Sequence, residues 1–267
     1  MKLNFTFGNS KLINSIATFP LPAGHSCPFA KECLSRFDRA SSKVIDGKHC
    51  RYRCFAATEE RYPSVNALRW RNFEMLRSLS SVEKLANLIN KSLPEARLVR
   101  IHPSGDFFTE KYFLAWLNVA MNHSLTTFYA YTKALPFWVK YRSWLPKNFK
   151  LVASYGGTHD HLIACHRLRS TRVVFSEQEA ADLGLELDNN DSLAFGGSKN
   201  FALLLHGAQP EGSEAGKAWY KLMKAGKGYS PKKKHQLTPA SLLKIHVTLK
   251  QGKIYLPQEV LTGRVLV

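Results

Sequence analysis

Four of the five cysteines in this chain of 267 residues lie within its first 54 residues. They follow the pattern Cys-x5-Cys-x16-Cys-x3-Cys and stand at Cys27, Cys33, Cys50 and Cys54. The short gaps make two pairs, and the longer loop lets one pair fold onto the other. Because thiolates bind zinc and iron–sulfur clusters well, the pattern predicts a metal centre, either a 4Fe–4S cluster or, as the alternative, Zn²⁺.

Two other roles for these cysteines are less well supported. Disulfides need an oxidising compartment, and the first residues show neither the basic nor the apolar region of a signal peptide. Burial as ordinary small side chains does not suit a segment this rich in charged residues. Cys165 stands apart from the others, and we expect it to be a buried packing residue.

The charge of the chain suggests its partner. It contains 38 Lys and Arg against 20 Asp and Glu, a net charge of +18. Such a charge attracts polyanions, so nucleic acid is the predicted partner, with a solvated basic surface as the alternative. No apolar run approaches the roughly 18 residues of a membrane-spanning helix, so we expect no membrane contact and a cytoplasmic location.

Basic residues concentrate near the C-terminus. Residues 215–258 hold ten lysines and no Asp or Glu. We predict an α/β domain over residues 1–215, with the cysteine cluster at 27–54, followed by a basic linker and a small β extension over 216–267. This extension either binds phosphates or is a solvated edge.

Strand-like apolar runs alternate with helical patterns, which predicts a mostly parallel α/β sheet, open or curled into a barrel. Strands are predicted at residues 17–21, 98–102, 126–131, 151–154, 172–175 and 201–205. Helices are predicted at residues 65–77, 82–93, 109–121, 135–144, 160–168 and 177–183, with Ser81 capping the second.

Polar residues follow most of the predicted strands, where parallel sheets place their ligand sites. We expect them to meet the cysteines at one mouth: Ser104, Gly105, Asp106, Lys133, Tyr155, His159, Glu177 and His206. Each has a structural alternative, since Asp106 could cap the helix that begins near Thr109 and Lys133 could face solvent. A second metal site at His161 and Cys165 is less favoured, because no other ligand pair lies nearby in the chain.

Several runs of this sequence resemble the phage and plasmid family called gene product 88. They are residues 21–28, 54–57, 69–73, 101–108, 128–133 and 174–177. The resemblance covers residues 1 to about 215 and implies a mobile-element protein in a prokaryotic or phage-infected cell. By itself it implies no particular chemistry.

The order of parts is also similar, more distantly, to that of radical S-adenosylmethionine enzymes. In those enzymes a cysteine loop follows the first strand of a partial (β/α) barrel and holds a 4Fe–4S cluster, and a turn after the second strand binds the methionine amino group. The likeness implies a partial barrel with an N-terminal cysteine loop and a short basic C-terminal extension. It also implies cofactor binding by Ser104, Gly105 and Asp106. The usual C-x3-C-x2-C is absent, since only Cys50 and Cys54 keep the first gap and Ala57 stands where the third cysteine would be.

Three functions therefore stay open. The first is a radical S-adenosylmethionine-like enzyme acting on nucleic acid or a nucleotide, with Lys133, Tyr155 and Glu177 as candidate catalytic residues. The second is a non-catalytic nucleic-acid-binding protein with a structural four-cysteine metal site and exposed Trp70 and Trp116. The third is a hydrolase or transferase that uses Asp106, His102 and Glu177 as acids and bases.

Overall fold

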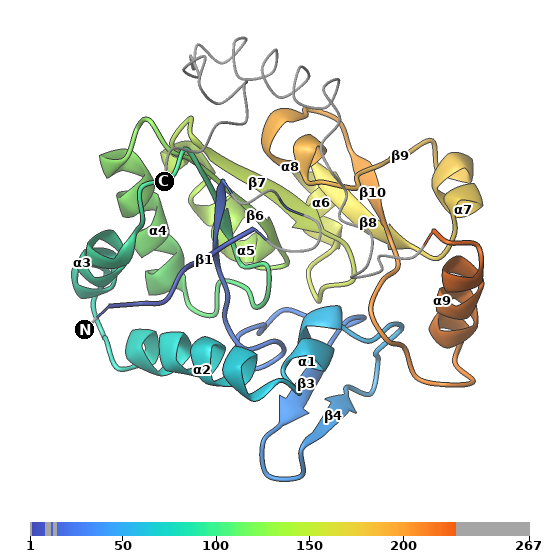
Figure 1. The fold of residues 1–267 in the computed structure, drawn as a ribbon. Helices are drawn as coiled ribbons and strands as arrows, with labels where there is room; N and C mark the ends of the chain where they lie inside the picture. The colour runs from blue at the N-terminus through green and yellow to red at the C-terminus, as the bar shows by residue number, and fades with distance from the viewer. Residues whose placement is uncertain (1, 9–11, 13–14, 228–267) are drawn as a thin grey trace, which may run out of the picture.

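The computed structural model describes residues 2–8, 12 and 15–227, and their centre is an eight-stranded sheet (Figure 1). The strands in sheet order are β1 (Thr6–Phe7), β2 (Ile16–Phe19), β5 (Leu98–Ile101), β6 (Thr127–Thr132), β7 (Phe149–Ser154), β8 (Ser170–Val174), β10 (Phe201–Leu204) and β9 (Glu186–Leu187). Only β1 pairs antiparallel within this sheet of the described residues. The predicted mixed α/β class with a mostly parallel sheet is confirmed.

From β2 to β10 the long parallel strands are neighbours in chain order, apart from the short strand β9 at the edge. The chain therefore steps across the sheet in one direction, with a helical crossover between successive strands. In the described residues the hydrogen-bonded order ends at β1 on one side and β9 on the other.

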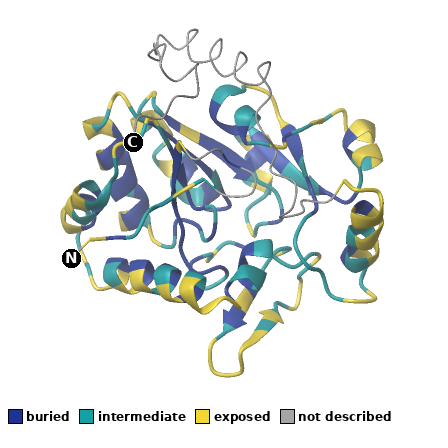
Figure 2. Cartoon of the chain, viewed as in Figure 1, coloured by how far each residue is buried: buried dark blue, intermediate teal, exposed yellow. Residues whose placement is uncertain are grey.

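One face of the sheet is covered by helices that bury their apolar sides against it (Figure 2). They are α2 (Pro63–Arg77), α3 (Val82–Ser92), α4 (Glu110–Asn122), α5 (Leu135–Lys140) and α6 (His161–Cys165). Along α4, Tyr112, Phe113, Trp116 and Ala120 recur at helical spacing and are fully buried. Because strand side chains alternate, the same face receives Val99 and its alternate neighbours.

The opposite face holds a second apolar cluster and a short helix, α8 (Ser192–Gly196). Ile16 of β2, Tyr129 of β6 and Phe201 of β10 belong to this one cluster, together with Phe195 of α8. Side chains from strands at opposite ends of the parallel order thus pack in one group.

The remaining elements lie at the margins of the sheet. They are the hairpin β3 (Ser35–Asp38) and β4 (Lys43–Asp46), α1 (Phe55–Glu59), the 3₁₀ helix η1 (Arg142–Trp144), α7 (Glu177–Asp182) and α9 (Glu214–Lys224). In Figure 1 the hairpin and α2 lie below the sheet, and α7 and α9 lie to its right.

The predicted domain boundary after residue 215 falls inside α9. Ala215 and Leu222 pack against β8 and β10, so residues 216–224 form a core-packed helix where a linker was expected. Ala215 and Leu222 are spaced two helical turns apart, which is the amphipathic pattern of a helix within this lysine-rich stretch. The β extension predicted farther on lies outside the described residues.

Most of the predicted strands and helices agree with the structure to within a few residues, although the helix predicted at 135–144 is split into α5 and η1 and that at 160–168 is shortened to α6. The Ser81 cap is also confirmed, since its side chain accepts the Lys84 N–H. The structural alternative for Asp106, a cap on this helix, does not hold, because Thr109 caps α4 by accepting the Tyr112 N–H. None of the described helices is long and apolar enough to span a membrane.

Candidate functional site

Residues 20–54, which we call the cysteine segment, connect β2 to α1 and run across the carboxyl ends of the parallel strands. At β5 the segment is held by two hydrogen bonds, since the Leu21 N–H donates to the Ser104 carbonyl at 2.9 Å and the Ser104 hydroxyl donates to the Leu21 carbonyl at 2.6 Å. Gly105 has φ +90°, and a Cβ there would lie 2.5 Å from the Ser26 Oγ. Glycine is therefore required where the loop after β5 touches the cysteine segment.

The loop after β7 holds the middle of the segment. The N–H groups of Lys31 and Glu32 both donate to the Gly156 carbonyl, at 3.0 and 2.9 Å. Asp160 in turn accepts the N–H groups of Gly156 and Gly157, which fixes the loop. This glycine pair therefore docks the cysteine segment.

The loops after β8 and β10 hold the end of the segment. The Arg51 guanidinium lies 4.7 Å from the centroid of the Phe175 ring. The Arg53 N–H donates to the Gln209 side chain at 2.7 Å, and the Phe55 ring packs on His206 at 4.4 Å. Four strand ends thus position one long loop.

Beneath the segment lies a cavity of about 160 Å³, which we call the cysteine cavity. Three of the four clustered cysteines, Cys27, Cys33 and Cys54, line it, whereas Cys50 does not. The Cys50 sulfur lies 3.1 Å from the Tyr52 carbonyl oxygen and 3.5 Å from the Ser35 hydroxyl. Strand-end residues complete the wall, among them Ser104, Gly105, Asp106, Lys133, Ser154 and His206.

Asp106 lies at the centre of a hydrogen-bond network. Its carboxylate accepts the Thr132 hydroxyl at 2.6 Å, the Lys133 N–H at 2.7 Å and its neighbour's N–H at 2.8 Å. Burial raises the pKa of Asp106, and these hydrogen bonds oppose the rise. Asp106 is 5% exposed and lines the cysteine cavity, so its carboxylate is placed to bind a positively charged group of a ligand.

Charge in the cavity is mixed. Burial alone would lower the pKa of Lys133, but the nearby Cys33 and Asp106 raise it overall. The Lys133 Nζ donates to the Ser154 hydroxyl at 2.7 Å. Burial is also the main reason why the pKa of Cys54 rises to about 12 and that of Cys27 rises well above its usual value.

Tyr155, His159 and Glu177 do not line this cavity. Side chains alternate along β7 and beyond, so Ser154 points inward and Tyr155 points away, where Arg172 lies 4.3 Å above its ring. Glu177 begins α7 on the surface and pairs with Lys227 at 2.5 Å. His159 packs against Phe29. Of the three predicted catalytic residues, only Lys133 lines the cavity.

Two further predictions fail on exposure. Trp116 is fully buried in the core under the helices, so it has no surface to offer a nucleic acid. Cys165 is exposed and does not pack in the core. Its position in the last turn of the short helix α6 leaves it on the outer side.

Sequence reasoning missed Arg100 and Tyr131, which also line the cavity. Arg100 is buried and pairs with Asp191 at 2.7 Å. The hydroxyls of Tyr129 and Tyr131 donate to the same carboxylate, each at 3.1 Å. A charged residue in the apolar run 98–101 was the available sign of a buried ion pair.

The donor set suits a soft metal or cluster by its chemistry, because three thiols share one cavity. As the side chains stand, no group of three or more His, Cys, Asp or Glu residues in the described part of the chain is arranged to hold a metal ion. The thiols therefore have to turn toward one another to bind one. Each of the other two cysteines already lies close enough to Cys27 to raise its pKa.

The chain matches the family model described as Gene product 88 over residues 2–221. That range includes every residue that lines the cysteine cavity. No curated protein and no solved structure matches the chain.

Proposed function

The chain belongs to the gene product 88 family, and we propose that it is an iron–sulfur enzyme of the radical S-adenosylmethionine type. Cys27, Cys33 and Cys54 hold a 4Fe–4S cluster in the cysteine cavity. The observation that carries the proposal is the meeting of these three thiols in one cavity with Asp106 and Lys133 at the carboxyl ends of parallel strands.

The arrangement of three cysteines and one apart favours an open site. A structural zinc site is closed by four protein ligands, whereas a catalytic centre keeps one position for a ligand. Cys50 lies outside the cavity, which leaves three thiols for a cluster. A cluster of this kind, when bound, supplies single electrons to a ligand beside it.

The residues of the chain would bind and orient that ligand. The Asp106 carboxylate accepts the ammonium group of S-adenosylmethionine, and Ser104 and Gly105 bring the backbone close to it. Lys133 faces the same cavity and binds an anionic group, either of the cofactor or of the substrate. Arg100 also lines the cavity, but its charge is paired with Asp191.

We also propose that the sheet curls into a partial (β/α) barrel. Support comes from the apolar cluster that joins β2, β6 and β10 on the face opposite the helices. A cavity lined by β5, β6, β7, β8 and β10 residues together fits such a curvature. The cysteine segment then covers the mouth at the carboxyl ends.

A second candidate function is a nucleic-acid-binding protein with a structural zinc site. It is favoured by the net charge of +18 and by Cys50, which is near enough to the cavity that Cys33 affects its pKa. A rotation of Cys50 would then complete a four-cysteine site. Either function suits the cytoplasm, which keeps thiols reduced.

Metal analysis separates the two. Protein purified without oxygen should be brown, absorb broadly near roughly 400 nm and carry about four irons per chain. Cys27→Ala, Cys33→Ala and Cys54→Ala should each lose the iron, and Cys50→Ala should keep most of it. Cys165→Ala is the matched control, because its thiol is exposed and distant in sequence.

Colourless protein with one zinc per chain, lost equally in all four cysteine variants, would instead establish the structural site. S-adenosylmethionine binding is then the second check. Calorimetric titration of the iron-loaded protein should show binding that Asp106→Asn weakens at least tenfold. No binding to the loaded wild-type protein would refute the cofactor assignment.

A further inference from the structure

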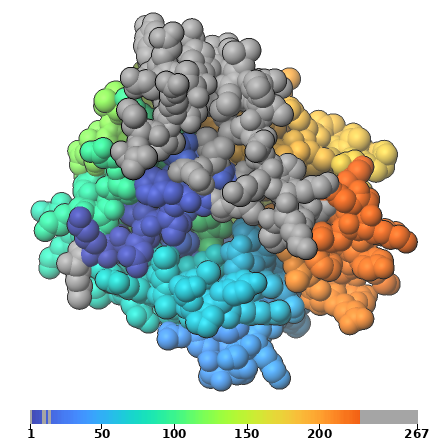
Figure 3. All heavy atoms as spheres, viewed as in Figure 1, coloured from blue at the N-terminus to red at the C-terminus, as the bar shows by residue number. Residues whose placement is uncertain are grey.

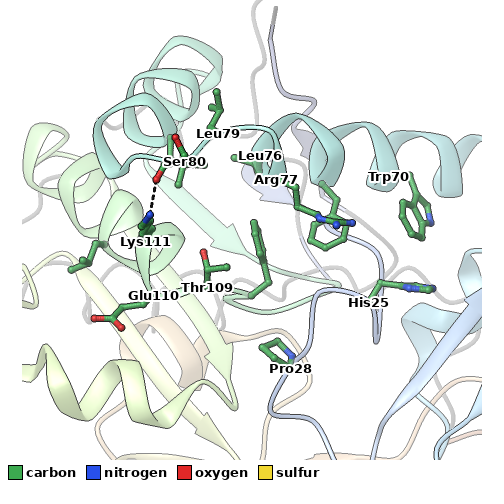
Figure 4. Close-up of a pocket in the computed structure, with 14 residues that line it drawn as sticks. His25, Pro28, Trp70, Leu76, Arg77, Leu79, Ser80, Thr109, Glu110 and Lys111 are labelled. Carbon is green, nitrogen blue, oxygen red and sulfur yellow. Dashed lines mark hydrogen bonds between the residues drawn. The ribbon is translucent and has the colours of Figure 1, made fainter.

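A second hollow is lined by residues that neighbour those of the cysteine cavity in the chain. Figure 4 shows this second hollow. Its volume is about 960 Å³, and it opens between α2, the start of α4 and residues 25–28. We call it the aromatic groove. Figure 4 shows Ser80 and Lys111 at one end, Trp70 and His25 at the other, and Arg77 between them.

Aromatic rings form a continuous row along the groove. His25 lies 4.8 Å from Trp70, Trp70 lies 6.0 Å from Phe73, and Phe73 lies 5.0 Å from Phe108, measured between ring centroids. Phe73 is buried, but the other three rings are half-buried and present some surface. Four aromatic rings in one open groove are unusual for a surface that only faces water.

Two basic side chains also line the groove. Arg77 and Lys111 are exposed, and neither forms an ion pair with an acidic residue in the described ranges. Lys111 donates to the Ser80 carbonyl at 2.8 Å, and Arg77 lies over the Phe73 ring. The one acidic side chain in the lining, Glu110, is taken up by Lys140 at 2.6 Å and by the Tyr141 hydroxyl.

We propose that the aromatic groove binds a single-stranded nucleic acid. Unpaired bases stack on the Trp70 and Phe108 rings, and phosphates bind Arg77 and Lys111. Bases inside a duplex have no free face for such stacking, so the groove selects single strands. The net charge of +18 favours a polyanion over a neutral or acidic peptide.

The groove lies beside the proposed reaction site. Residues 25–28 and 104–109 supply lining to both hollows, with Cys27 and Asp106 on one side and His25 and Phe108 on the other. A strand in the groove would therefore lie next to the cysteine cavity. The proposal rests on the nucleic-acid binding put forward as the second candidate function, and it does not depend on the cluster.

The test is anisotropy of labelled oligonucleotides with the full chain over a series of salt concentrations. We expect single-stranded DNA or RNA to bind at least tenfold more tightly than a duplex of equal length. The double variant Arg77→Gln/Lys111→Gln should bind about tenfold more weakly, with a salt slope reduced by about 1.4. Its control, Lys217→Gln/Lys221→Gln, removes two exposed charges from α9 and should change binding little.

Stacking is tested at Trp70. Trp70→Ala should weaken binding about tenfold and Trp70→Phe much less, whereas Trp144→Ala at an exposed tryptophan outside the groove should have no effect. Unchanged binding in the groove variants would overturn the proposal, whether or not the α9 control loses binding. Equal binding of duplex and single strand would also overturn it. Iron content measured on the same samples shows whether the cluster assignment fails separately.

Discussion

Two aspartates are buried at different places in the fold, and they are used differently. Asp191, beside α8, receives Arg100 and two tyrosine hydroxyls, so its charge is neutralised within the fold. Asp106, at the carboxyl end of β5, accepts hydrogen bonds, lies near the Lys133 side chain without an ion pair as short as that of Asp191 with Arg100, and faces the cysteine cavity. The first arrangement stabilises the fold, and the second leaves an acid available to a ligand.

This difference follows from where the loops lie. The α8 segment packs Ala194 and Phe195 into the apolar cluster on the face of the sheet opposite the helices. The cysteine segment passes over the strand ends, and the cysteine cavity lies below it. Figure 3 shows α2 and the hairpin in the lower part of the view. Packed polar groups are structural, whereas polar groups beside a cavity are placed for chemistry.

Asp191→Asn should have the largest effect on stability. It leaves the buried Arg100 guanidinium without a negative partner, which costs about 3–5 kcal/mol of unfolding free energy. Urea unfolding of the two proteins measures the loss. The double variant Arg100→Met/Asp191→Asn should recover much of the lost unfolding free energy. A loss below about 1 kcal/mol in the single variant would mean that the ion pair does little to stabilise the fold.

Glu60 is a third buried acid, and it supports the cysteine segment by accepting the Ala23 N–H at 2.7 Å. Burial raises its pKa from 4.5 to about 7. The protonated form is therefore the more stable one in the fold, so this contribution is complete below pH 4.5 and is lost as the pH rises through about 7. This difference between the pKa of Glu60 in the folded and unfolded protein corresponds to about 3 kcal/mol of unfolding free energy.

Glu60→Gln tests this, since glutamine stays neutral. Urea unfolding at several pH values should show wild-type stability falling relative to the variant between pH 5 and pH 8. Parallel pH profiles for the two proteins would show that Glu60 does not titrate in this range.

Gly105→Ala should have a moderate effect. The alanine Cβ would clash with Ser26 and Leu21, and φ +90° is unfavourable for it, which together cost about 2 kcal/mol. The clash also pushes the cysteine segment away from β5, so metal content should fall. Gly184→Ala has a positive φ with open space around it and controls for backbone strain alone. Full metal content in Gly105→Ala would mean that this contact does not position the thiols.

Asp106→Asn should have the smallest effect on stability, about 1 kcal/mol, because asparagine keeps the shape and part of the hydrogen bonding. Its main effect should be on ligand binding, with iron content unchanged. This outcome would support the contrast between Asp191, which stabilises the fold, and Asp106, which is available to a ligand. A loss of stability as large as that of Asp191→Asn would remove it.

The order of the long parallel strands and of most helices between them could be predicted because local patterns encode them, whereas the hairpin of β3 and β4 and the short elements β1, β9, α1 and α8 were not predicted. Apolar runs at 98–102 and 126–131 and the helical spacing of residues 109–121 each depend on neighbours only a few residues away. The helix α9 is not predicted, because its lysine-rich composition favours a linker. Its apolar residues Ala215 and Leu222 are nevertheless spaced to pack on a sheet.

The sequence by itself determined the alternation of strands and helices, and with it the edge where polar residues gather. It placed Asp106 and Lys133 there because parallel strands end at one edge. Only the tertiary structure decided which way each side chain points: Ser154 inward and Tyr155 outward, Cys54 into the cavity and Cys50 beside it. These choices depend on contacts between segments far apart in the chain, such as Gly105 with Ser26 and Arg100 with Asp191, which no local pattern records.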